Sequence, residues 1–311
     1  MRVLFMGTPE FAVPCLDMLT NEGYNVIGVV TQPDKPKGRG HKLAQPPVKE
    51  YALQKGIPVY QPKTLKNNAF ENTLKKLAPD LIVVVAYGKI LPKYILEYPN
   101  YGCINVHASL LPKYRGAGPI QWAVINGEKE TGITTMFMDE GMDTGDMILK
   151  KKTQIRSNET AGELHDRLSA LGAEVLKETL ALVEKGSIPR MPQPHQQATY
   201  APMLDKSIAK IDWAKPAIEI KNLVRGLNPW PVAFTYYKGR IMKIWSVDIV
   251  KNCTDGVPGI ILKHIKGQGL AVKAGDNNCI IIEEVQFEGG KRMKVDEYLR
   301  GHSIEFGECL G

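Results

Sequence analysis

Asn105 and His107 are the residues whose types and spacing best suit chemistry. They lie two positions apart at the end of the apolar run 102–106, so on a strand both side chains would point to the same side. A histidine titrates near neutral pH, and an uncharged amide donates a hydrogen bond to a carbonyl oxygen. The pair favours a reaction in which a carbonyl gains negative charge during nucleophilic attack. A strand-end histidine is more often structural, so the pair alone leaves the chemistry open.

A second group of candidates lies in the acidic segment 139–146, which reads DEGMDTGD. In isolation such a segment is an ordinary turn. A carboxylate within it, such as Asp143, could also orient a histidine and stabilise its imidazolium form. The order of its acids does not match a calcium loop, so no metal site is expected.

Other chemistries lack their motifs. The chain has no G-x-G-x-x-G and no Walker sequence, and Ser109 has no G-x-S-x-G setting, which argues against nucleotide binding and a serine hydrolase. Five cysteines are scattered without a C-x-x-C pair. This argues against a disulfide framework or a zinc site and favours a reducing compartment.

The elements that must position these residues alternate between strand and helix. Apolar strand runs at 2–6, 26–30, 80–86 and 102–106 are separated by helix-like stretches at 9–19, 48–55 and 69–77. This order predicts an α/β fold with a doubly wound, mostly parallel, Rossmann-like sheet. Such sheets bind ligands beyond the carboxyl ends of their strands, which is where the residues after 86 and 106 fall.

The pattern changes in the second part of the chain. An amphipathic helix is predicted at 160–184, and a Pro- and Gln-rich stretch follows it. Short strand candidates separated by turn residues then predict a small antiparallel β-barrel of the OB-like type: 233–237, 242–250, 259–263, 270–273 and 279–285. We therefore expect a catalytic domain at 1–188, a linker at 189–205 and a barrel domain at 206–311.

Positive charge is concentrated in two places. The net charge is +7, and the segment 206–273 holds 12 Lys and Arg against 4 Asp and Glu. An irregular basic loop, QPDKPKGRGHK, occupies 32–42. Both features suit contact with a phosphate backbone, although a solvated face explains the charge equally well.

No membrane segment is predicted. The longest apolar stretch, 81–87, is far shorter than the ~18 residues that a membrane-spanning helix needs. No cleavable N-terminal signal is expected, because Gly7-Thr8-Pro9 interrupts the first apolar run. We therefore expect a cytoplasmic protein with no membrane partner.

Two motifs carry a resemblance to a known family. The stretch INVHASLLPKYRGAGPIQW at 104–122 and DEGMDTGD at 139–146 resemble the signature of the 10-formyltetrahydrofolate-dependent formyltransferases. Members of this family include the glycinamide ribonucleotide and methionyl-tRNA enzymes. Similarity to the methionyl-tRNA branch covers essentially the whole chain, including FMGTPEFAVP at 5–14, ATYAP at 198–202, RGLNPWP at 225–231 and GGKRM at 289–293. The purine-pathway relatives lack the second domain.

The resemblance implies an activity and a catalytic set. A formyl group would pass from 10-formyltetrahydrofolate to the amino group of methionine on initiator Met-tRNA, giving N-formylmethionyl-tRNA for translation initiation. Asn105 and protonated His107 would stabilise the oxyanion, and Asp143 would orient His107 and aid proton transfer. Neither a covalent enzyme intermediate nor a catalytic metal would be needed.

The resemblance also implies binding residues. The folate would lie in a cleft at the sheet edge, against Ser109, Leu110, Leu111, Pro112, Ala86, Tyr87, Gly88 and Asp139. The basic loop would meet the tRNA acceptor stem through Lys35, Lys37, Arg39, His41 and Lys42. The protein is expected to act as a monomer.

Two alternatives stay open from the sequence. The same catalytic set would serve a formyltransferase acting on an amino sugar nucleotide, although the basic loop and basic second domain favour tRNA. A folate-binding or RNA-binding protein without catalysis is disfavoured by the complete set of Asn105, His107 and Asp143. A fragment ending near Gly186 is expected to keep this set and the folate cleft.

Overall fold

The computed structural model describes residues 1–37, 42–253 and 256–311. The chain divides into two compact units. The large unit comprises Met1–Pro119, Glu130–Gln154 and His165–Pro202. The small unit comprises Ile120–Lys129, Ile155–Leu164 and Met203–Gly311, so two short segments that interrupt the sequence of the large unit belong to it.

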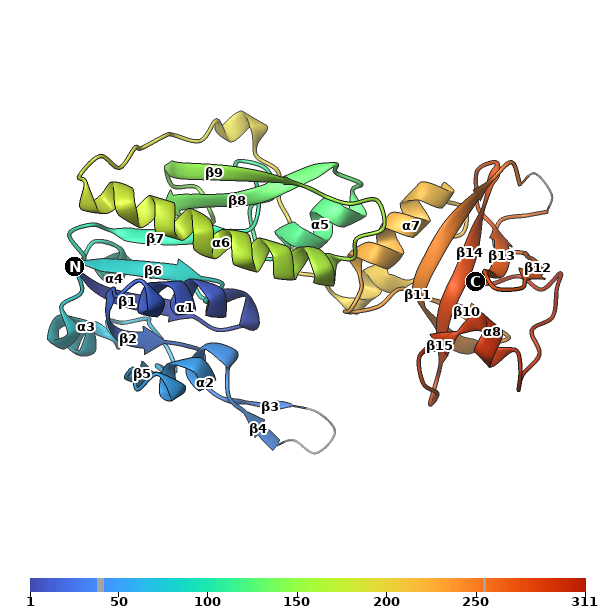
Figure 1. The fold of residues 1–311 in the computed structure, drawn as a ribbon, viewed down its shortest axis with the longest axis horizontal. Coiled ribbons are helices and arrows are strands. Elements are labelled where there is room, and N and C mark those ends of the chain that lie inside the picture. Colours follow the sequence, from blue (N-terminus) through green and yellow to red (C-terminus); the bar gives the residue numbers. More distant parts are fainter. Residues whose placement is uncertain (38–41, 254–255) are drawn as a thin grey trace. The chain divides into compact units, whose positions relative to one another are not determined.

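A seven-stranded sheet forms the centre of the large unit, with strand order β5-β2-β1-β6-β7-β8-β9 (Figure 1). The first five strands in this order run parallel, whereas β8 and β9 are antiparallel additions at one edge. The sheet is therefore mostly parallel, as the sequence predicts. Its strands are β1 Arg2–Gly7, β2 Asn25–Val30, β5 Val59–Tyr60, β6 Leu81–Val85, β7 Cys103–His107, β8 Glu130–Phe137 and β9 Met147–Gln154.

Helices cover both faces of this sheet, which confirms the doubly wound prediction. On one face, Leu4 and Ile82 share a buried apolar cluster with Leu74 of α3. On the other, Gly172 of α6 comes so close to Val106 that a Cβ would lie 3.2 Å from it. The helices are η1 Glu10–Ala12, α1 Val13–Asn21, α2 Pro47–Gln54, α3 Glu71–Leu77, α4 Lys93–Leu96, α6 Ala161–Glu184 and η2 His195–Gln197.

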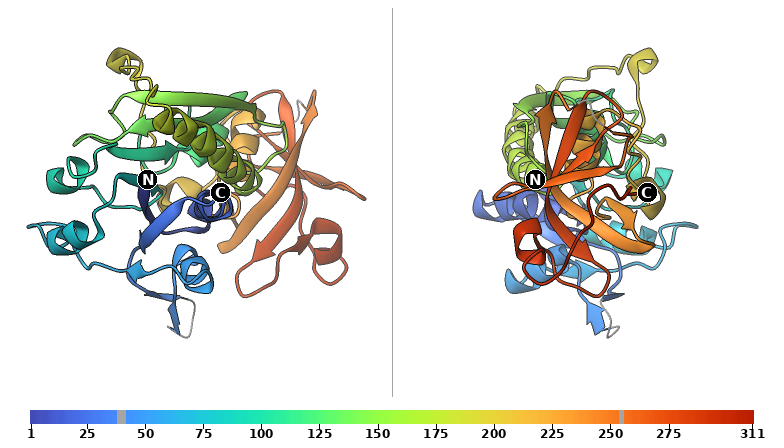
Figure 2. Two further views of the ribbon diagram at one scale, coloured as in Figure 1. Left: turned by 60° about the vertical axis from the view of Figure 1, so that its left-hand side comes forward. Right: turned by 90° about the vertical axis from the view of Figure 1, so that its right-hand side faces the viewer.

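The strands of the small unit, orange to red in Figure 2, form an antiparallel sheet. Its strand order is β10-β11-β14-β13-β12, and β15 also pairs with β14. Its buried cluster joins Ile220 and Val224, one turn apart on α7, to Ile244 of β11 and Ile282 of β14. The elements are α5 Pro119–Ile125, η3 Lys206–Ala209, α7 Ala217–Gly226, β10 Phe234–Tyr237, β11 Arg240–Lys251, β12 Ile261–Ile265, β13 Gly269–Lys273, β14 Asn278–Phe287, β15 Met293–Lys294 and α8 Val295–Tyr298.

Three features differ from the sequence predictions. The basic loop contains a short antiparallel hairpin, β3 Lys35–Lys37 with β4 Lys42–Ala44. The strands β8 and β9 were not predicted, because neither contains a long apolar run. In β8, buried threonines take apolar positions and form hydrogen bonds inside the protein, as between Thr135 and Thr179. The sequence argued against a disulfide framework, and the structure has a single disulfide among the described residues, between Cys253, just after β11, and Cys279 of β14, with which β11 pairs.

Within the described part of the chain, no helix has the length and apolar character needed to cross a membrane.

Candidate active site

The three predicted catalytic residues lie together in the large unit. Asn105 and His107 are at the carboxyl end of β7, where strand alternation turns both side chains to one side. Asp143 comes from the loop between β8 and β9. Its Oδ2 atom lies 3.6 Å from Nδ1 of His107, and its Oδ1 atom accepts a hydrogen bond of 3.4 Å from the Asn105 amide. The amide, the imidazole and the carboxylate therefore form one cluster.

Backbone groups fix the orientation of the imidazole and the carboxylate. Nε2 of His107 lies 3.0 Å from the carbonyl oxygen of Tyr114. A carbonyl only accepts, so Nε2 carries the proton of this bond and Nδ1 faces the carboxylate. The N–H of Gly116 donates to Oδ2 of Asp143 at 2.8 Å. The carboxylate is thus placed to stabilise a proton on Nδ1, which suits acid–base chemistry.

The loop that carries Asp143 is tightly constrained. Asp143 has a φ of 54°, in the left-handed region that residues other than glycine rarely adopt. A Cβ on Gly145 would lie 1.9 Å from the carbonyl oxygen of Phe137, so only glycine fits there. Oδ1 of Asp139 accepts from the N–H of Gly141 at 3.0 Å and stabilises the same loop. The side chain of Asp139, predicted to bind folate, therefore also has a structural role.

The segment 109–112, predicted to line the folate cleft, is held from inside the protein. Ser109 is fully buried, and its hydroxyl donates to a backbone carbonyl four residues further on. The hydroxyl of Thr134 donates to the Ser109 carbonyl at 2.7 Å and accepts from the Leu111 N–H at 3.1 Å. Leu111 is fully buried, whereas Leu110 is half-buried. The side chains of Ser109 and Leu111 thus fix the segment, which leaves its backbone and Leu110 as the more accessible groups.

The turn after β6 presents small residues at the same sheet edge. Ala86 and Gly88 are exposed and have φ values of 47° and 78°. Tyr87 between them is buried, and burial raises its pKa to about 12. The Tyr87 carbonyl accepts from the Thr8 hydroxyl at 3.2 Å and the Gln32 amide at 3.1 Å. A flat ring can approach the backbone of this anchored turn closely at Ala86 and Gly88, because both residues are small and exposed.

The predicted tRNA-binding residues lie on or next to the hairpin β3–β4. Lys35 is exposed on β3, and Lys37 and Lys42 belong to β3 and β4. Two further predicted residues, Arg39 and His41, lie outside the described residues.

A polar network fixes the chain where it enters this hairpin. The carboxylate of Asp34 accepts from the Gln61 amide at 2.7 Å and from the Lys49 ammonium at 2.7 Å. Both hydrogen bonds stabilise the charged carboxylate, the one from Gln61 more than the one from Lys49, and they hold the pKa of Asp34 below its usual value.

The sequence predictions assigned no role to two residues that contact this site. Thr199 accepts from the Tyr114 N–H through its hydroxyl at 2.9 Å and from the Arg115 N–H through its carbonyl at 2.8 Å. Gln193 donates to the backbone of the Asp143 loop and accepts from Arg115. Gln193 and Thr199 belong to the stretch predicted as a linker, whose composition distinguishes neither of them from its neighbours.

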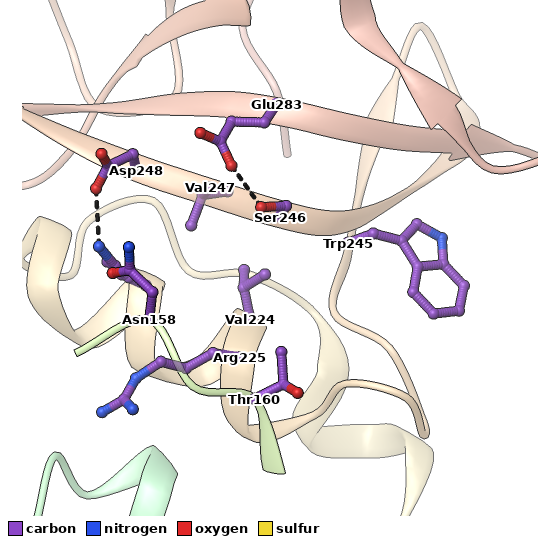
Figure 3. Close-up of a pocket in the computed structure, with 10 residues that line it drawn as sticks. Asn158, Thr160, Val224, Arg225, Trp245, Ser246, Val247, Asp248 and Glu283 are labelled. Carbon is purple, nitrogen blue, oxygen red and sulfur yellow. Dashed lines mark hydrogen bonds and ion pairs between the residues drawn. The ribbon is translucent and has the colours of Figure 1, made fainter. Parts of the chain in front are cut away.

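The small unit contains a separate pocket of about 90 Å³, lined by α7, β11, β14 and the segment 155–164 (Figure 3). Its carboxylates are engaged by pocket neighbours: Lys221 donates to Asp248 at 2.7 Å, and the Ser246 hydroxyl donates to Glu283. Burial lowers the pKa of Arg225, whose guanidinium donates to Asn222 at 2.9 Å. None of the predicted site residues lines this pocket, and we assign it no ligand.

Comparison with known proteins agrees with this fold and cluster. Residues 1–180 match the formyl transferase family, and residues 203–303 match the formyl transferase C-terminal domain. The chain is 58% identical to the methionyl-tRNA formyltransferases of Alkaliphilus oremlandii and of Acetivibrio thermocellus, with 100% of each chain covered. A crystal structure of the N-formyltransferase from Helicobacter canadensis, in complex with folinic acid and dTDP-3-aminofucose, has a TM-score of 0.68 at 21% identity, covering 90% of this chain and 98% of that one.

A mostly parallel sheet with an Asn, His and Asp cluster at its edge, followed by an antiparallel unit, is thus the architecture of a formyl-group transferase. The chain belongs to the formyl transferase family and, within it, to the methionyl-tRNA formyltransferases.

Proposed function

We propose that this protein transfers the formyl group of 10-formyltetrahydrofolate to the amino group of methionine on initiator Met-tRNA, giving N-formylmethionyl-tRNA for translation initiation. The observation that carries the proposal is the cluster of Asn105, His107 and Asp143, in a chain 58% identical over its full length to methionyl-tRNA formyltransferases. Binding of folate or RNA alone would not require an amide, an imidazole and a carboxylate in contact.

The cluster suits attack of an amine on a formyl carbon, which the bound folate donor supplies. As the new carbon–nitrogen bond forms, the formyl oxygen gains negative charge. Asn105 has two amide N–H groups, so one can hold Asp143 while the other donates to this oxygen. A protonated His107, whose two N–H groups face the Tyr114 carbonyl and Asp143, adds positive charge near this oxygen. Charges and donors already in place stabilise the oxyanion without reorganisation.

Proton transfer falls to His107 and Asp143. The attacking amine loses a proton, and the folate nitrogen gains one when its bond to the formyl carbon breaks. Asp143, 3.6 Å from Nδ1 of His107, is placed to accept the first proton and to stabilise the imidazolium. The proton taken from the amine is then delivered to the departing folate nitrogen, so the enzyme regains its starting protonation state without a covalent enzyme intermediate or a catalytic metal.

We assign the folate to the sheet edge beyond β6 and β7. The turn of Ala86, Tyr87 and Gly88 would receive the ring, because its exposed residues are small. The other folate contacts proposed are Leu110 and Asp139, whose side chains are accessible, and the backbone of Ser109, Leu111 and Pro112, whose side chains are buried.

The tRNA acceptor stem would contact the hairpin β3–β4 through Lys35, Lys37, Arg39, His41 and Lys42, and the domain 206–311 would contact the tRNA backbone. This assignment rests on charge, since 206–273 holds 12 Lys and Arg against 4 Asp and Glu. We propose a catalytic domain at 1–188 and a linker at 189–205, in a monomeric cytoplasmic protein.

One assay separates this function from its alternatives. The protein is incubated with 10-formyltetrahydrofolate and either methionyl initiator tRNA, methionyl elongator tRNA or an amino sugar nucleotide, and N-formyl product is measured. Formylation of the initiator tRNA above both other acceptors is expected. Preference for the sugar would make the protein a sugar N-formyltransferase, and no product with any acceptor would leave a binding protein.

The tRNA surface has its own test. Arg39→Ala should lower kcat/KM for tRNA about tenfold. It should also reduce the salt dependence, because a protein that contacts fewer phosphates releases fewer counterions when the tRNA binds. Lys152→Ala is the matched control, since Lys152 is an exposed residue of β9 that pairs with Glu130. Salt-insensitive kcat/KM values that are equal in both variants and wild type would contradict the assignment of these residues to tRNA.

A further inference from the structure

Gln193 is a buried side chain whose hydrogen-bonding capacity is fully used. Its exposed fraction is only 4%, although it lies between two exposed prolines. Its amide nitrogen donates to the carbonyl oxygens of Asp143 and Gly145, both at 2.8 Å. Its amide oxygen accepts from Nε of Arg115 at 3.1 Å and from a terminal guanidinium nitrogen at 2.7 Å. Two donated and two accepted bonds exhaust what a glutamine amide can make.

The partners also determine which way the amide points. A guanidinium has only donors, and backbone carbonyls only accept. The amide oxygen of Gln193 must therefore face Arg115, and the amide nitrogen must face the Asp143 loop. Neither a carboxylate nor an apolar side chain of the same length could make both sets of bonds.

Arg115 connects this clamp to the rest of the site. Its side chain is buried, with 2% exposed, and one guanidinium nitrogen lies 3.2 Å from Nδ1 of His195. The residue before it provides the carbonyl that contacts Nε2 of His107, and the residue after it provides the N–H that binds Asp143. A shift of Arg115 would thus move the supports of both the imidazole and the carboxylate.

The loop that Gln193 holds needs such support. Asp143 adopts a left-handed backbone conformation, which is unfavourable for a residue with a side chain. Gln193 bonds the backbone on both sides of Thr144, and so fixes the loop at the residue whose carboxylate faces His107. Without this clamp the loop could relax and carry the carboxylate away from Nδ1.

We infer that Gln193 and Arg115 are positioning residues for formyl transfer, which act by clamping the backbone of the Asp143 loop so that its carboxylate stays beside His107. The inference rests on the proposed function for its catalytic readout. By this inference, the stretch after α6 not only connects the domains but also helps to hold the catalytic loop in place.

The test compares substitutions of two glutamines in one segment. Gln193→Glu keeps the size and the contact with Arg115, but it directs an oxygen at two carbonyl oxygens. Gln193→Met keeps the length without charge and serves if the first variant does not fold. Gln197→Ala is the control, because Gln197 is exposed four positions away. We expect the Gln193 variants to lower kcat about 10- to 100-fold, as displacements near 1 Å do, with KM for both substrates changed by less than about threefold.

A double-mutant cycle separates positioning from general damage. If Gln193 acts through Asp143, its substitution should cause no further loss of kcat in an Asp143→Asn background. An equal loss in both backgrounds, or a normal kcat in the Gln193 variants, would overturn the inference.

Hydrogen exchange provides a readout independent of activity. The Gly116 amide, bound to Asp143, should exchange at least about tenfold faster in Gln193→Met than in wild type or Gln197→Ala. Unchanged exchange at Gly116 would overturn the inference, whereas faster exchange in a protein that formylates no acceptor would refute only the proposed function.

Discussion

Replacing Asp143 by asparagine removes one charge from the site while nearly preserving its shape. Each carboxylate oxygen has a donor, Oδ1 from Asn105 and Oδ2 from the Gly116 N–H. An amide has only one oxygen, so in Asp143→Asn one of these donors would face an N–H group. The variant also loses the negative charge beside His107.

The geometry sets the size of the expected effect. Oδ2 lies 3.6 Å from Nδ1 of His107, and the side chains of His107 and Asp143 are 7% and 15% exposed. Near this distance, unit charges attract by about 1 kcal/mol in water and about 4 kcal/mol at an effective dielectric constant of about 20. The low exposure favours the larger figure. Because about 1.4 kcal/mol corresponds to a factor of ten in rate, kcat should fall about 10²–10³-fold.

The measurement is single-turnover formylation of methionyl-tRNA, together with the dissociation constant for the folate. Folate binding should change little, since the lost charge acts on the reacting groups. The controls are Asp139→Asn and Asp146→Asn, which each remove a charge from the same loop. A near wild-type rate in Asp143→Asn, or a larger loss in either control, would refute the assignment of Asp143.

Three further outcomes are expected. His107→Ala should lower kcat about 10²–10⁴-fold in single-turnover assays while the protein stays folded by circular dichroism; near wild-type turnover would remove His107 from the mechanism. Gly145→Ala should lower kcat at least about tenfold, because its Cβ would lie 1.9 Å from the Phe137 carbonyl, whereas Gly301→Ala, with nothing within 4 Å, should not. The ammonium of Lys221 holds the pKa of Asp248 below its usual value. This pair stabilises the folded protein at pH values above the ordinary pKa of a carboxylate, and the stabilisation is lost as the pH falls through the folded pKa of Asp248. Since Asp248 is 57% exposed, Lys221→Met should cost less than about 1 kcal/mol in urea unfolding at about pH 7, and the cost should disappear once the pH is well below the folded pKa of Asp248; a cost independent of pH would contradict the ion pair.

The parallel core of the fold was predictable because its strands are apolar on both faces. In β6, all five residues are buried, and an uninterrupted run such as Leu81–Val85 admits few other readings. The antiparallel strand β8, which lies between β7 and the edge strand β9, was missed for the opposite reason. It includes three buried threonines, Thr131, Thr134 and Thr135, and the hydroxyls of Thr134 and Thr135 have their partners outside the strand. A hydrophobicity pattern does not reveal that a threonine is buried, because its hydroxyl gains its hydrogen-bond partner only when the chain folds.

The clustering of Asn105, His107 and Asp143 was predictable in part. Strand alternation places the first two on one side, and the motif resemblance adds the third. The supports of the cluster were not predictable, because they are backbone groups or distant side chains. A backbone carbonyl such as that of Tyr114, or an N–H such as that of Gly116, is present whatever the residue type. Only the position of these groups after β7 gives them a role.

The stretch after α6 contacts the site in ways that its composition does not indicate. Its proline and glutamine content indicated a linker, and a fragment ending near Gly186 was expected to keep the site intact. Such a fragment would keep the catalytic cluster but lose Gln193, which bonds the Asp143 loop, and Thr199, which bonds both Tyr114 and Arg115. The groups that orient His107 and Asp143 would then lack their outer partners. A segment without regular secondary structure can therefore determine the geometry of a site, because hydrogen bonds rather than helical or strand periodicity fix its place.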